Sequence, residues 1–292
     1  MCDNPASHDD ARHEELPPKV SRRALFGATS GGLLAGVALG VGGTIAVESQ
    51  WPSAPQDFVY AGTTGTDRLG ILPIIWSVPV STRAFSLTFD DGPDPDFTPK
   101  VLAALAEFGV LATFNIMGWN ALHHGDLLRE VIAGGHEIAN HSWSHLDAAD
   151  TEADVLEREV LYGKQVIEEI SGQTLTLFRP PRGNITGAQL RFAAQAGEQV
   201  VVWSFNGGLG GTPSVAELRD RSVAGIEAGD IVLLHDGIGR GTFQRDSSSA
   251  RDLIAARNRE IEALPGVIDG VLARGLRPMT VSQLLAEPRI TL

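Results

Sequence analysis

From residue 83 to the C-terminus, short apolar runs alternate with longer segments in which apolar residues recur every three or four positions. Short runs rich in β-branched and aromatic residues favour strands, whereas helical spacing of apolar residues favours amphipathic helices. The strand-like runs are 83–89, 111–117, 136–140, 175–179, 199–204, 230–234 and 276–280. The helical segments are 98–108, 126–133, 152–171, 187–197, 214–226 and 250–274.

Strands that alternate with helices predict a parallel sheet joined by right-handed crossovers. The expected fold class is therefore α/β, and the strand count suits a barrel of about seven parallel strands, one unit short of eight. In the segment 152–171, helical spacing predicts a polar side made of Glu152, Glu157, Glu159 and Lys164.

The N-terminal region has a different pattern. Residues 1–20 are polar and irregular, and Arg22-Arg23 precede an uncharged, glycine-rich and weakly apolar stretch at 24–47. A paired arginine before such a stretch resembles a twin-arginine export signal. The small residues Thr44 and Ala46 predict cleavage after Ala46, and an uncleaved membrane anchor through 24–47 is the alternative.

Both alternatives predict export, so the protein is expected to be secreted or anchored on the outer face of the cytoplasmic membrane. Residues 48–80 are rich in proline, glycine and polar residues, which is typical of a linker. The expected organisation is a signal or membrane anchor at 1–46, a linker and lead-in at 47–80, and the catalytic domain at 81–292.

Composition narrows the chemistry. The chain has 292 residues, a formal net charge of −13 and a pI near 5.0, and an acidic surface argues against nucleic acid as a partner. Cys2 is the single cysteine, which excludes an intramolecular disulfide and a cysteine-rich zinc site. Any transition-metal site must therefore use carboxylates and some of the eight histidines. The sequence predicts no obligate protein partner.

Asp90 and Asp91 follow the strand-like run 83–89, and Gly-Pro then ends the strand. This is the carboxyl end of a strand, where α/β folds and barrels place their chemistry. Two adjacent carboxylates repel each other, so each needs a cation or a proton nearby. The alternative is a solvated turn, because Asp-Gly is a common turn pair.

His141 and His145 follow the strand-like run 136–140. In a helical turn, this spacing places both imidazoles on one face, within reach of a single ion. Asp91 can supply a third ligand, and two histidines with one carboxylate leave positions for water and substrate. The alternative is a pair of histidines in a polar loop.

Two further residues end strand-like runs. Arg179 precedes two prolines that force an extended path, and it can pair with Asp90 and keep that carboxylate ionised. His235 ends the apolar run 230–234 and is a candidate general acid. A turn after an edge strand and a structural histidine are the respective alternatives.

In this order and spacing, these elements resemble the polysaccharide deacetylase family, also called the NodB-homology or carbohydrate esterase family 4 domain. Thr88–Pro93 is similar to its first motif, His141–His145 to its second, Arg179–Gly183 to its third and Leu233–His235 to its fifth. The resemblance extends from about residue 83 to the C-terminus. It implies a deformed (β/α) barrel with fewer than eight strands.

The resemblance also implies a role for each matching residue. These roles are catalytic base for Asp90, metal ligands for Asp91, His141 and His145, orientation of the base for Arg179, catalytic acid for His235, an oxyanion-binding backbone N–H at Arg182, and a wall of the acetyl pocket for Trp203. The implied enzyme is a metal-dependent hydrolase of carbon–nitrogen bonds other than peptide bonds. It would remove N-acetyl groups from a polysaccharide, for example N-acetylglucosamine units of a cell-wall or chitin-like glycan. Zinc suits the ligand set best, and cobalt, nickel or manganese also fit.

The sequence departs from the family at two places. Arg182 stands where the family usually has tyrosine, and the fourth motif lacks its aspartate, since no acidic residue lies between Glu198 and Glu217. In the family this aspartate steadies the acid histidine, and Asp236 would point the opposite way from His235 on a strand. Two alternatives therefore stay open: a hydrolase of the same fold acting on a non-sugar amide or an O-acetyl ester, and a non-catalytic wall-binding module.

Overall fold

The computed structural model describes residues 73–208, 213–239 and 248–290. The expected signal or anchor at 1–46 and the linker up to residue 72 lie outside these ranges. Within them, each helix is too short or too polar to cross a membrane.

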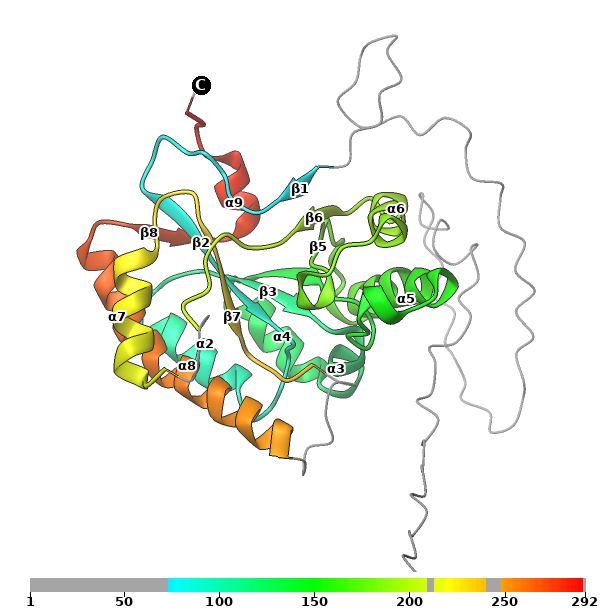
Figure 1. Cartoon of the computed structure of the whole chain (residues 1–292), viewed down its shortest axis with the longest axis horizontal. Helices are drawn as coiled ribbons and strands as arrows, with labels where there is room; N and C mark the ends of the chain where they lie inside the picture. Colours follow the sequence, from blue (N-terminus) through cyan, green and yellow to red (C-terminus); the bar gives the residue numbers. More distant parts are fainter. Residues whose placement is uncertain (1–72, 209–212, 240–247, 291–292) are drawn as a thin grey trace, which may run out of the picture.

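A curled sheet forms the centre of the molecule (Figure 1). In the described residues its strands are β1 (Ile74–Ile75), β2 (Ala84–Asp90), β3 (Thr113–Ile116), β4 (Glu137–Asn140), β5 (Leu177–Phe178), β6 (Gln199–Val201), β7 (Ile231–His235) and β8 (Arg277–Met279). Their order is β1-β6-β5-β4-β3-β2-β7, with β8 also against β2, and the strand pairings are parallel. Phe205, beyond β6, bridges to Val232 of β7, so the segment after β6 lies against the strand at the far end of the sheet.

The seven predicted strands are all present, and the expected α/β deformed barrel is confirmed. Strand β1 was not predicted, because two residues give no usable hydrophobic period. It pairs with β6, and the nearby Val78 and Val80 are buried in the core. Part of the lead-in assigned to 47–80 therefore packs as an edge of the barrel.

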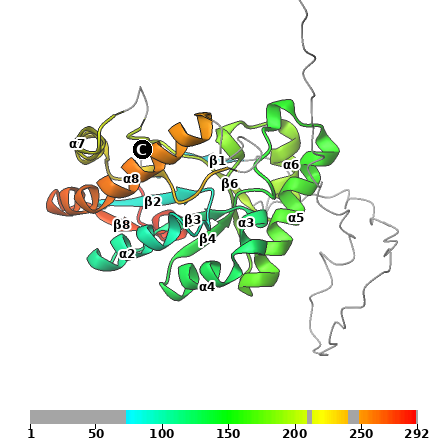
Figure 2. The same cartoon turned by 90° about the horizontal axis from the view of Figure 1, so that it is seen from below.

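Helices surround the strands, as the view from below shows (Figure 2). Their bounds are α2 (Thr98–Phe108), α3 (Gly118–His123), α4 (Gly125–Ala133), α5 (Ala153–Ser171), α6 (Gly187–Gln195), α7 (Val215–Gly225), α8 (Ser248–Ala273) and α9 (Val281–Ala286), with short 3-10 turns at Ala148–Asp150 and Pro181–Gly183. The six predicted helices are present, while α3 and α9 were missed because six residues are too few to show a helical period.

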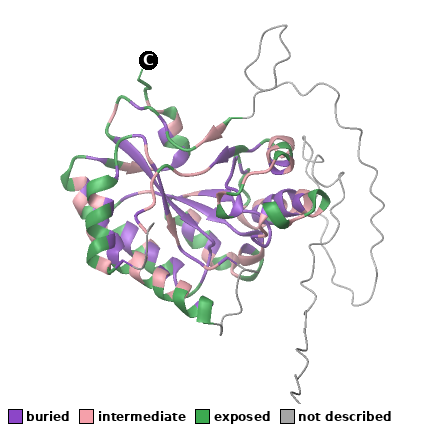
Figure 3. Ribbon diagram, in the orientation of Figure 1, coloured by how far each residue is buried: buried purple, intermediate pink, exposed green. Residues whose placement is uncertain are grey.

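Burial follows this layering: the strands are largely buried, and the helices expose their outer sides (Figure 3). Every residue of β2 is buried, because this strand pairs with β3, β7 and β8. The last residue of β2 is Asp90, so this fully buried strand positions one of the candidate catalytic groups.

The predicted polar side of α5 is partly wrong. Glu159 and Lys164 are buried, at 1% and 7% exposure. Glu159 accepts hydrogen bonds from the backbone N–H and the hydroxyl of Ser144, and Lys164 donates to the carbonyl of Leu175. Helical spacing could not reveal these partners, because they lie on loops that fold back over the helix.

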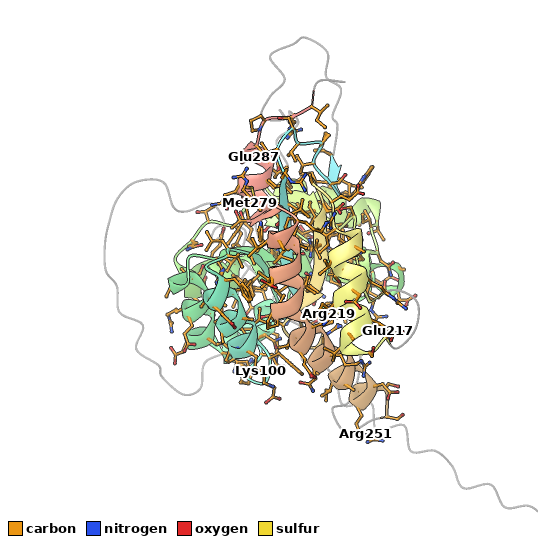
Figure 4. All side chains as sticks on the ribbon, turned by 90° about the vertical axis from the view of Figure 1, so that its left-hand side faces the viewer. Lys100, Glu217, Arg219, Arg251, Met279 and Glu287 are labelled. Atoms are coloured by element: carbon orange, nitrogen blue, oxygen red, sulfur yellow. The ribbon has the colours of Figure 1, made fainter. Side chains whose placement is uncertain are left out.

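Helices α7 and α8 lie side by side along one flank (Figure 4). The labelled Glu217 and Arg219 of α7 and Arg251 of α8 are exposed on the outer surface. The opposite side of α8 packs against the barrel through residues that include Arg257, Ala263 and Leu264. Helix α8 therefore has a buried charged residue, Arg257, on the side that faces the barrel.

Candidate metal centre and active site

Asp90 and Asp91 point to different partners because the chain turns sharply between them. Asp90 ends β2, whereas Asp91 has a left-handed backbone with φ of 75°. The carbonyl of Asp91 accepts a hydrogen bond from the Asn120 side chain at 2.7 Å. Gly237 packs against this turn so closely that a Cβ there would lie 2.3 Å from the Asp91 carbonyl oxygen. The unusual backbone is thus held by close packing on both sides.

His141 and His145 lie in an irregular loop after β4, and the helical turn assumed from their spacing is not formed. Ser142 and His145 adopt left-handed backbones with φ of 66° and 64°. The Ser142 hydroxyl accepts a hydrogen bond from the His145 N–H, and Glu159 holds the backbone N–H of Ser144. The loop brings the two imidazoles together by these contacts rather than by helical periodicity.

The side chains of Asp91, His141 and His145 converge on one point. Their ligand atoms all lie within 4.8 Å of one another, and Oδ1 of Asp91 is 3.5 Å from Nε2 of His141 and 3.3 Å from Nε2 of His145. Oδ1 of Asp91 is buried and has no hydrogen-bond partner. A buried carboxylate oxygen facing two imidazole nitrogens fits a divalent cation, so the donor set suits the metal that the family resemblance implies.

The hydrogen bond of Nδ1 of His141 determines that Nε2 of this ring faces Asp91 and His145. Nδ1 of His141 lies 2.8 Å from the carbonyl oxygen of Arg179. A carbonyl only accepts, so Nδ1 carries the proton and Nε2 presents its lone pair. The Arg179 backbone therefore orients one ligand while its side chain reaches the neighbouring carboxylate.

The side chain of Arg179 is fully buried and pairs with Asp90, with Nη1 of Arg179 2.7 Å from Oδ1 of Asp90. The Asn115 amide donates to the same oxygen at 2.6 Å. Burial by itself would raise the pKa of Asp90, but the positive charge of Arg179 and the nearby His141 and His235 outweigh it and lower that pKa. Asp90 is thus held ionised beside the candidate metal site.

Two of the three candidate ligands, Asp91 and His145, favour the protonation states that metal binding requires. At His141 burial acts to lower the pKa, but the neighbouring carboxylates of Asp90 and Asp91 outweigh it and raise that pKa, so a bound cation would have to displace a proton there. Burial opposes ionisation of Asp91, but interactions with the neighbouring His145, His141 and Arg257 side chains outweigh it and lower the pKa of that carboxyl. Burial lowers the pKa of His145 to about 4, although Asp91 acts in the opposite direction. Metal ligation needs an ionised carboxylate and neutral imidazoles, which is the state favoured at Asp91 and His145.

His235 ends β7 and lies directly beside Asp90 in the sheet register. Its Nδ1 is 3.1 Å from Oε2 of Glu260, on helix α8. Sequence reasoning missed Glu260, because nothing in the sequence around Glu260 links it to a residue on β7.

Asp236 points away from His235, as expected, and accepts a hydrogen bond from the Thr98 hydroxyl at 2.6 Å. Burial raises the pKa of Asp236 to about 8.

Arg257 is a second residue of α8 that the sequence did not indicate. Its guanidinium lies 3.4 Å from Oδ2 of Asp91 and 3.6 Å from Oε1 of Glu260, and its Nε donates to the carbonyl of Gly237. One arginine therefore connects a candidate metal ligand with the partner of the candidate acid.

A cavity of about 270 Å³ opens over these groups, and the sequence-predicted site residues other than Arg179 line it. Its remaining lining includes Leu233, Leu253 and Arg257. Trp203 packs against Gly183, where a Cβ would lie 2.6 Å from the Trp203 ring, so glycine lets the indole form one wall.

Arg182, at the edge of this cavity, has a left-handed backbone with φ of 59°, and its side chain reaches Asp147 at 3.6 Å. The structure thus places Asp90, Asp91, His141, His145, Arg179, Arg182, Trp203 and His235 around one pocket. The expected oxyanion role of the Arg182 backbone stays a prediction.

Comparison with protein families gives a match to the polysaccharide deacetylase model over residues 77–201. A peptidoglycan-N-acetylglucosamine deacetylase of Bacillus cereus is 36% identical over 214 residues, which cover 73% of this chain and 92% of that protein. A chitooligosaccharide deacetylase of Sinorhizobium fredii is 37% identical over 180 residues, covering 61% of this chain and 84% of that protein.

Solved structures give the same fold. The crystal structure of a peptidoglycan N-acetylglucosamine deacetylase has a TM-score of 0.64 at 25% identity and covers 75% of this chain and 95% of its own. A carbohydrate esterase family 4 pseudoenzyme from Bacillus anthracis has a TM-score of 0.63 at 20% identity, covering 75% of this chain and 70% of its own. The second likeness concerns the fold alone, so any argument for activity has to come from the site.

Proposed function

This chain belongs to the polysaccharide deacetylase family, and on that premise we propose that it hydrolyses the N-acetyl groups of N-acetylglucosamine units in a cell-wall or chitin-like glycan. The observation that carries the proposal is the convergence of Asp91, His141 and His145 beside an ionised Asp90. The reaction consumes one water and releases acetate and the free amine of the sugar. The relatives named for deacetylation of peptidoglycan and chitooligosaccharide support this substrate class.

Asp91, His141 and His145 would hold a divalent cation, for which zinc is our first choice. Such a cation supplies Lewis acidity to the amide carbonyl and lowers the pKa of a bound water. Elemental analysis of the purified protein tests both the presence and the identity of the metal. One metal per chain is expected, and a protein free of transition metal after purification with zinc would contradict the assignment.

Asp90 acts as the general base. Its Oδ1 is engaged by Arg179 and Asn115, whereas Oδ2 faces Nε2 of His141 at 3.7 Å. Oδ2 is therefore the oxygen that takes the proton from the attacking water. Because Arg179 keeps the carboxylate ionised, the base is ready at neutral pH.

His235 acts as the general acid. An amine is a poor leaving group until it is protonated, so the carbon–nitrogen bond breaks as the imidazolium gives its proton to the nitrogen. The bonding electrons go to that nitrogen, and the acetyl carbon leaves as acetate. The base and the acid sit in different surroundings: Asp90 faces a guanidinium, and His235 faces the carboxylate of Glu260.

Release of acetate from N-acetylglucosamine oligomers tests the function. We expect Asp90→Asn to lower kcat about 10²- to 10⁴-fold, the usual contribution of a general base, without loss of the bound metal. Asp126→Asn, an exposed carboxylate on α4, is the matched control and is expected to leave the rate unchanged. Cleavage of small amides or O-acetyl esters without release from glycans would favour the first alternative. Glycan binding without hydrolysis would favour the wall-binding module.

We extend the proposal to location: the chain is exported by the twin-arginine route and meets its glycan outside the cytoplasmic membrane. The motif Arg22-Arg23 before the uncharged stretch 24–47 supports this. The replacement of both arginines by lysine is expected to retain the protein in the cytoplasm. A mature N-terminus at Val47 would indicate cleavage after Ala46, and an intact chain in the membrane fraction would indicate an anchor.

A further inference from the structure

The loop after β6 lacks the acidic residue that the family places there, yet His235 has a carboxylate partner from another element. We propose that Glu260 of helix α8 is the positioning residue of the catalytic acid, holding the His235 ring in place from the side opposite the substrate. This proposal rests on the function proposed above.

Geometry carries the inference. Oε2 of Glu260 lies 3.1 Å from Nδ1 of His235, and the two side chains are only 12% and 16% exposed. Glu260 lies on the side of α8 that faces the barrel, one helical turn after the buried Arg257 and one turn before the buried Leu264. The carboxylate is therefore delivered by a rigid helix that packs on the barrel.

The loop that follows β6 passes beside this carboxylate. A Cβ at Gly208 would lie 3.7 Å from Oε1 of Glu260, and a small cavity is lined by Asn206, Gly207, Gly208 and Glu260 together. A Cβ at Gly207 would collide with the Ser222 hydroxyl at 2.4 Å. Gly207 and Gly208 thus fit a backbone that runs close to α7 and α8, and α8 supplies the acidic group.

Charge is arranged to keep Glu260 ionised. Arg257 faces Oε1 at 3.6 Å while His235 faces Oε2, so each carboxylate oxygen has a cationic or donor partner. Burial opposes ionisation, but His235 and Arg257 outweigh it and lower the pKa of Glu260. An ionised carboxylate can only accept at Nδ1 of His235, so it orients the ring whose Nε2 proton is the one that the leaving amine needs.

In the proposed step, the His235–Glu260 pair loses one proton, which comes from Nε2 of His235. Nδ1–H of His235 donates to Glu260 before and after the step, and only the Nε2–H bond breaks as the amine takes its proton. Glu260 therefore acts through His235 and exchanges no proton itself, as expected of a residue that fixes tautomer and orientation.

A pair of substrates distinguishes positioning of the acid from a purely structural role. We expect Glu260→Gln to lower kcat about 10- to 100-fold on N-acetylglucosamine oligomers, with little change in KM, because the leaving amine needs the acid. On 4-nitrophenyl acetate the phenolate leaves without protonation, so the rate should stay within about 3-fold. Glu260→Asp, which keeps the charge, should recover part of the loss. Glu262→Gln, at an exposed position on the same helix, is the matched control and should match the wild type on both substrates.

An equal loss on both substrates, or no loss on either, would overturn the proposal. Nitrogen-15 NMR of the His235 imidazole in the zinc-loaded protein gives a test that needs no turnover. We expect the neutral ring to carry its proton on Nδ1 in the wild type and to shift toward Nε2 in Glu260→Ala. If the wild-type ring carries it on Nε2, Glu260 does not position His235. If the wild type releases no acetate while the NMR result holds, the proposed function fails and the positioning contact stands.

Discussion

Asp90 and Glu198 are equally removed from solvent, at 4% and 5% exposure, but their ionisation is driven in opposite directions. Asp90 faces the Arg179 guanidinium directly, and its pKa is lowered against the effect of burial. Glu198 accepts one hydrogen bond from Asn140, and burial raises its pKa to about 8 although Lys164 opposes the rise. Burial is the same at both places, so the contacting groups decide the charge.

The difference corresponds to what each region does. The proposed base Asp90 would act as an anion beside the candidate metal site, and two buried groups, Arg179 and Asn115, are directed at it. Glu198 lies behind the site, where Lys164 instead pairs with Glu168 and donates to the carbonyl of Leu175. At neutral pH the pKa shift favours a neutral Glu198, which acts as a hydrogen-bonding support for Asn140.

The support reaches the site through Asn140. Its amide contacts Glu198, and its carbonyl oxygen Oδ1 accepts a hydrogen bond from the backbone N–H of Ser142, next to His141. The two regions therefore lie at opposite ends of one network, with the candidate base at the charged Asp90 end and a supporting carboxyl at the neutral Glu198 end.

The largest expected effect is the loss of activity on removal of the metal, which tests the charged Asp90 end of the network. A chelator should abolish acetate release, and zinc should restore it. His145→Ala, which deletes one candidate ligand, should lower the metal affinity and kcat more than about 100-fold. Added zinc should raise the Tm of the wild type by binding only the folded state, and raise it less in the variant.

His123→Ala removes an exposed imidazole on α3 and is the matched control for this prediction. It should retain both activity and the zinc-dependent rise in Tm. Retention of full activity by His145→Ala would show that the converging side chains do not hold the catalytic metal.

Arg179→Met should make Asp90 resemble Glu198, a buried carboxyl whose pKa is raised by burial. Without the guanidinium, burial would raise the pKa of Asp90, so the acid limb of the pH–rate profile should move to higher pH. Loss of one partner from a buried ion pair should also destabilise the fold by about 3–5 kcal/mol. Urea unfolding and the pH dependence of acetate release measure the two effects.

Arg129→Met breaks an exposed ion pair with Asp126 and provides the contrast, since it should change neither stability nor the pH profile appreciably. An unchanged acid limb in Arg179→Met would mean that some other group keeps Asp90 ionised, and the comparison between the two buried carboxylates would then lose its physical basis.

The charged end was predictable from the sequence to a large extent. Asp90, Asp91 and His235 directly end or follow strands, and parallel strands gather their carboxyl ends at one edge of the barrel. His141 and His145 come together as expected, but in a loop with left-handed residues rather than a helical turn. Motif spacing indicated the meeting point and did not reveal how the chain reaches it.

The supporting contacts were not predictable in the same way. Glu159 on α5 and Glu260 on α8 carry no local pattern that separates them from exposed helical glutamates. Their partners, Ser144 and His235, lie 15 and 25 residues away along the chain. Only the packing of each helix on the barrel turns these side chains inward, so contacts of this kind require the tertiary structure.

The neutral end gives the smallest predicted effect, a change in the pH dependence of stability. The pKa of Glu198 is about 8 in the folded protein, against 4.5 for an ordinary glutamate. Between these values the folded state binds one more proton than the unfolded chain, so stability falls as pH rises. The stabilisation that protonated Glu198 contributes to the folded state is fully present below pH 4.5 and is lost as pH rises through 8.

The variant Glu198→Gln cannot ionise and keeps an acceptor for Asn140. Its stability relative to the wild type should therefore rise with pH, by at most about 1.4 kcal/mol per pH unit.

Urea unfolding at several pH values between these limits, at one saturating zinc concentration, measures that difference. Metal binding affects both proteins alike, because Glu198 is not among the candidate ligands, so its own pH dependence cancels in the comparison. Glu107→Gln, at an exposed position of α2, should show a difference from the wild type that does not vary with pH. If Glu198→Gln behaves like this control, Glu198 is ionised when folded, as Asp90 is. Lys164, rather than burial, would then control its charge, and the two ends of the network would work by the same principle.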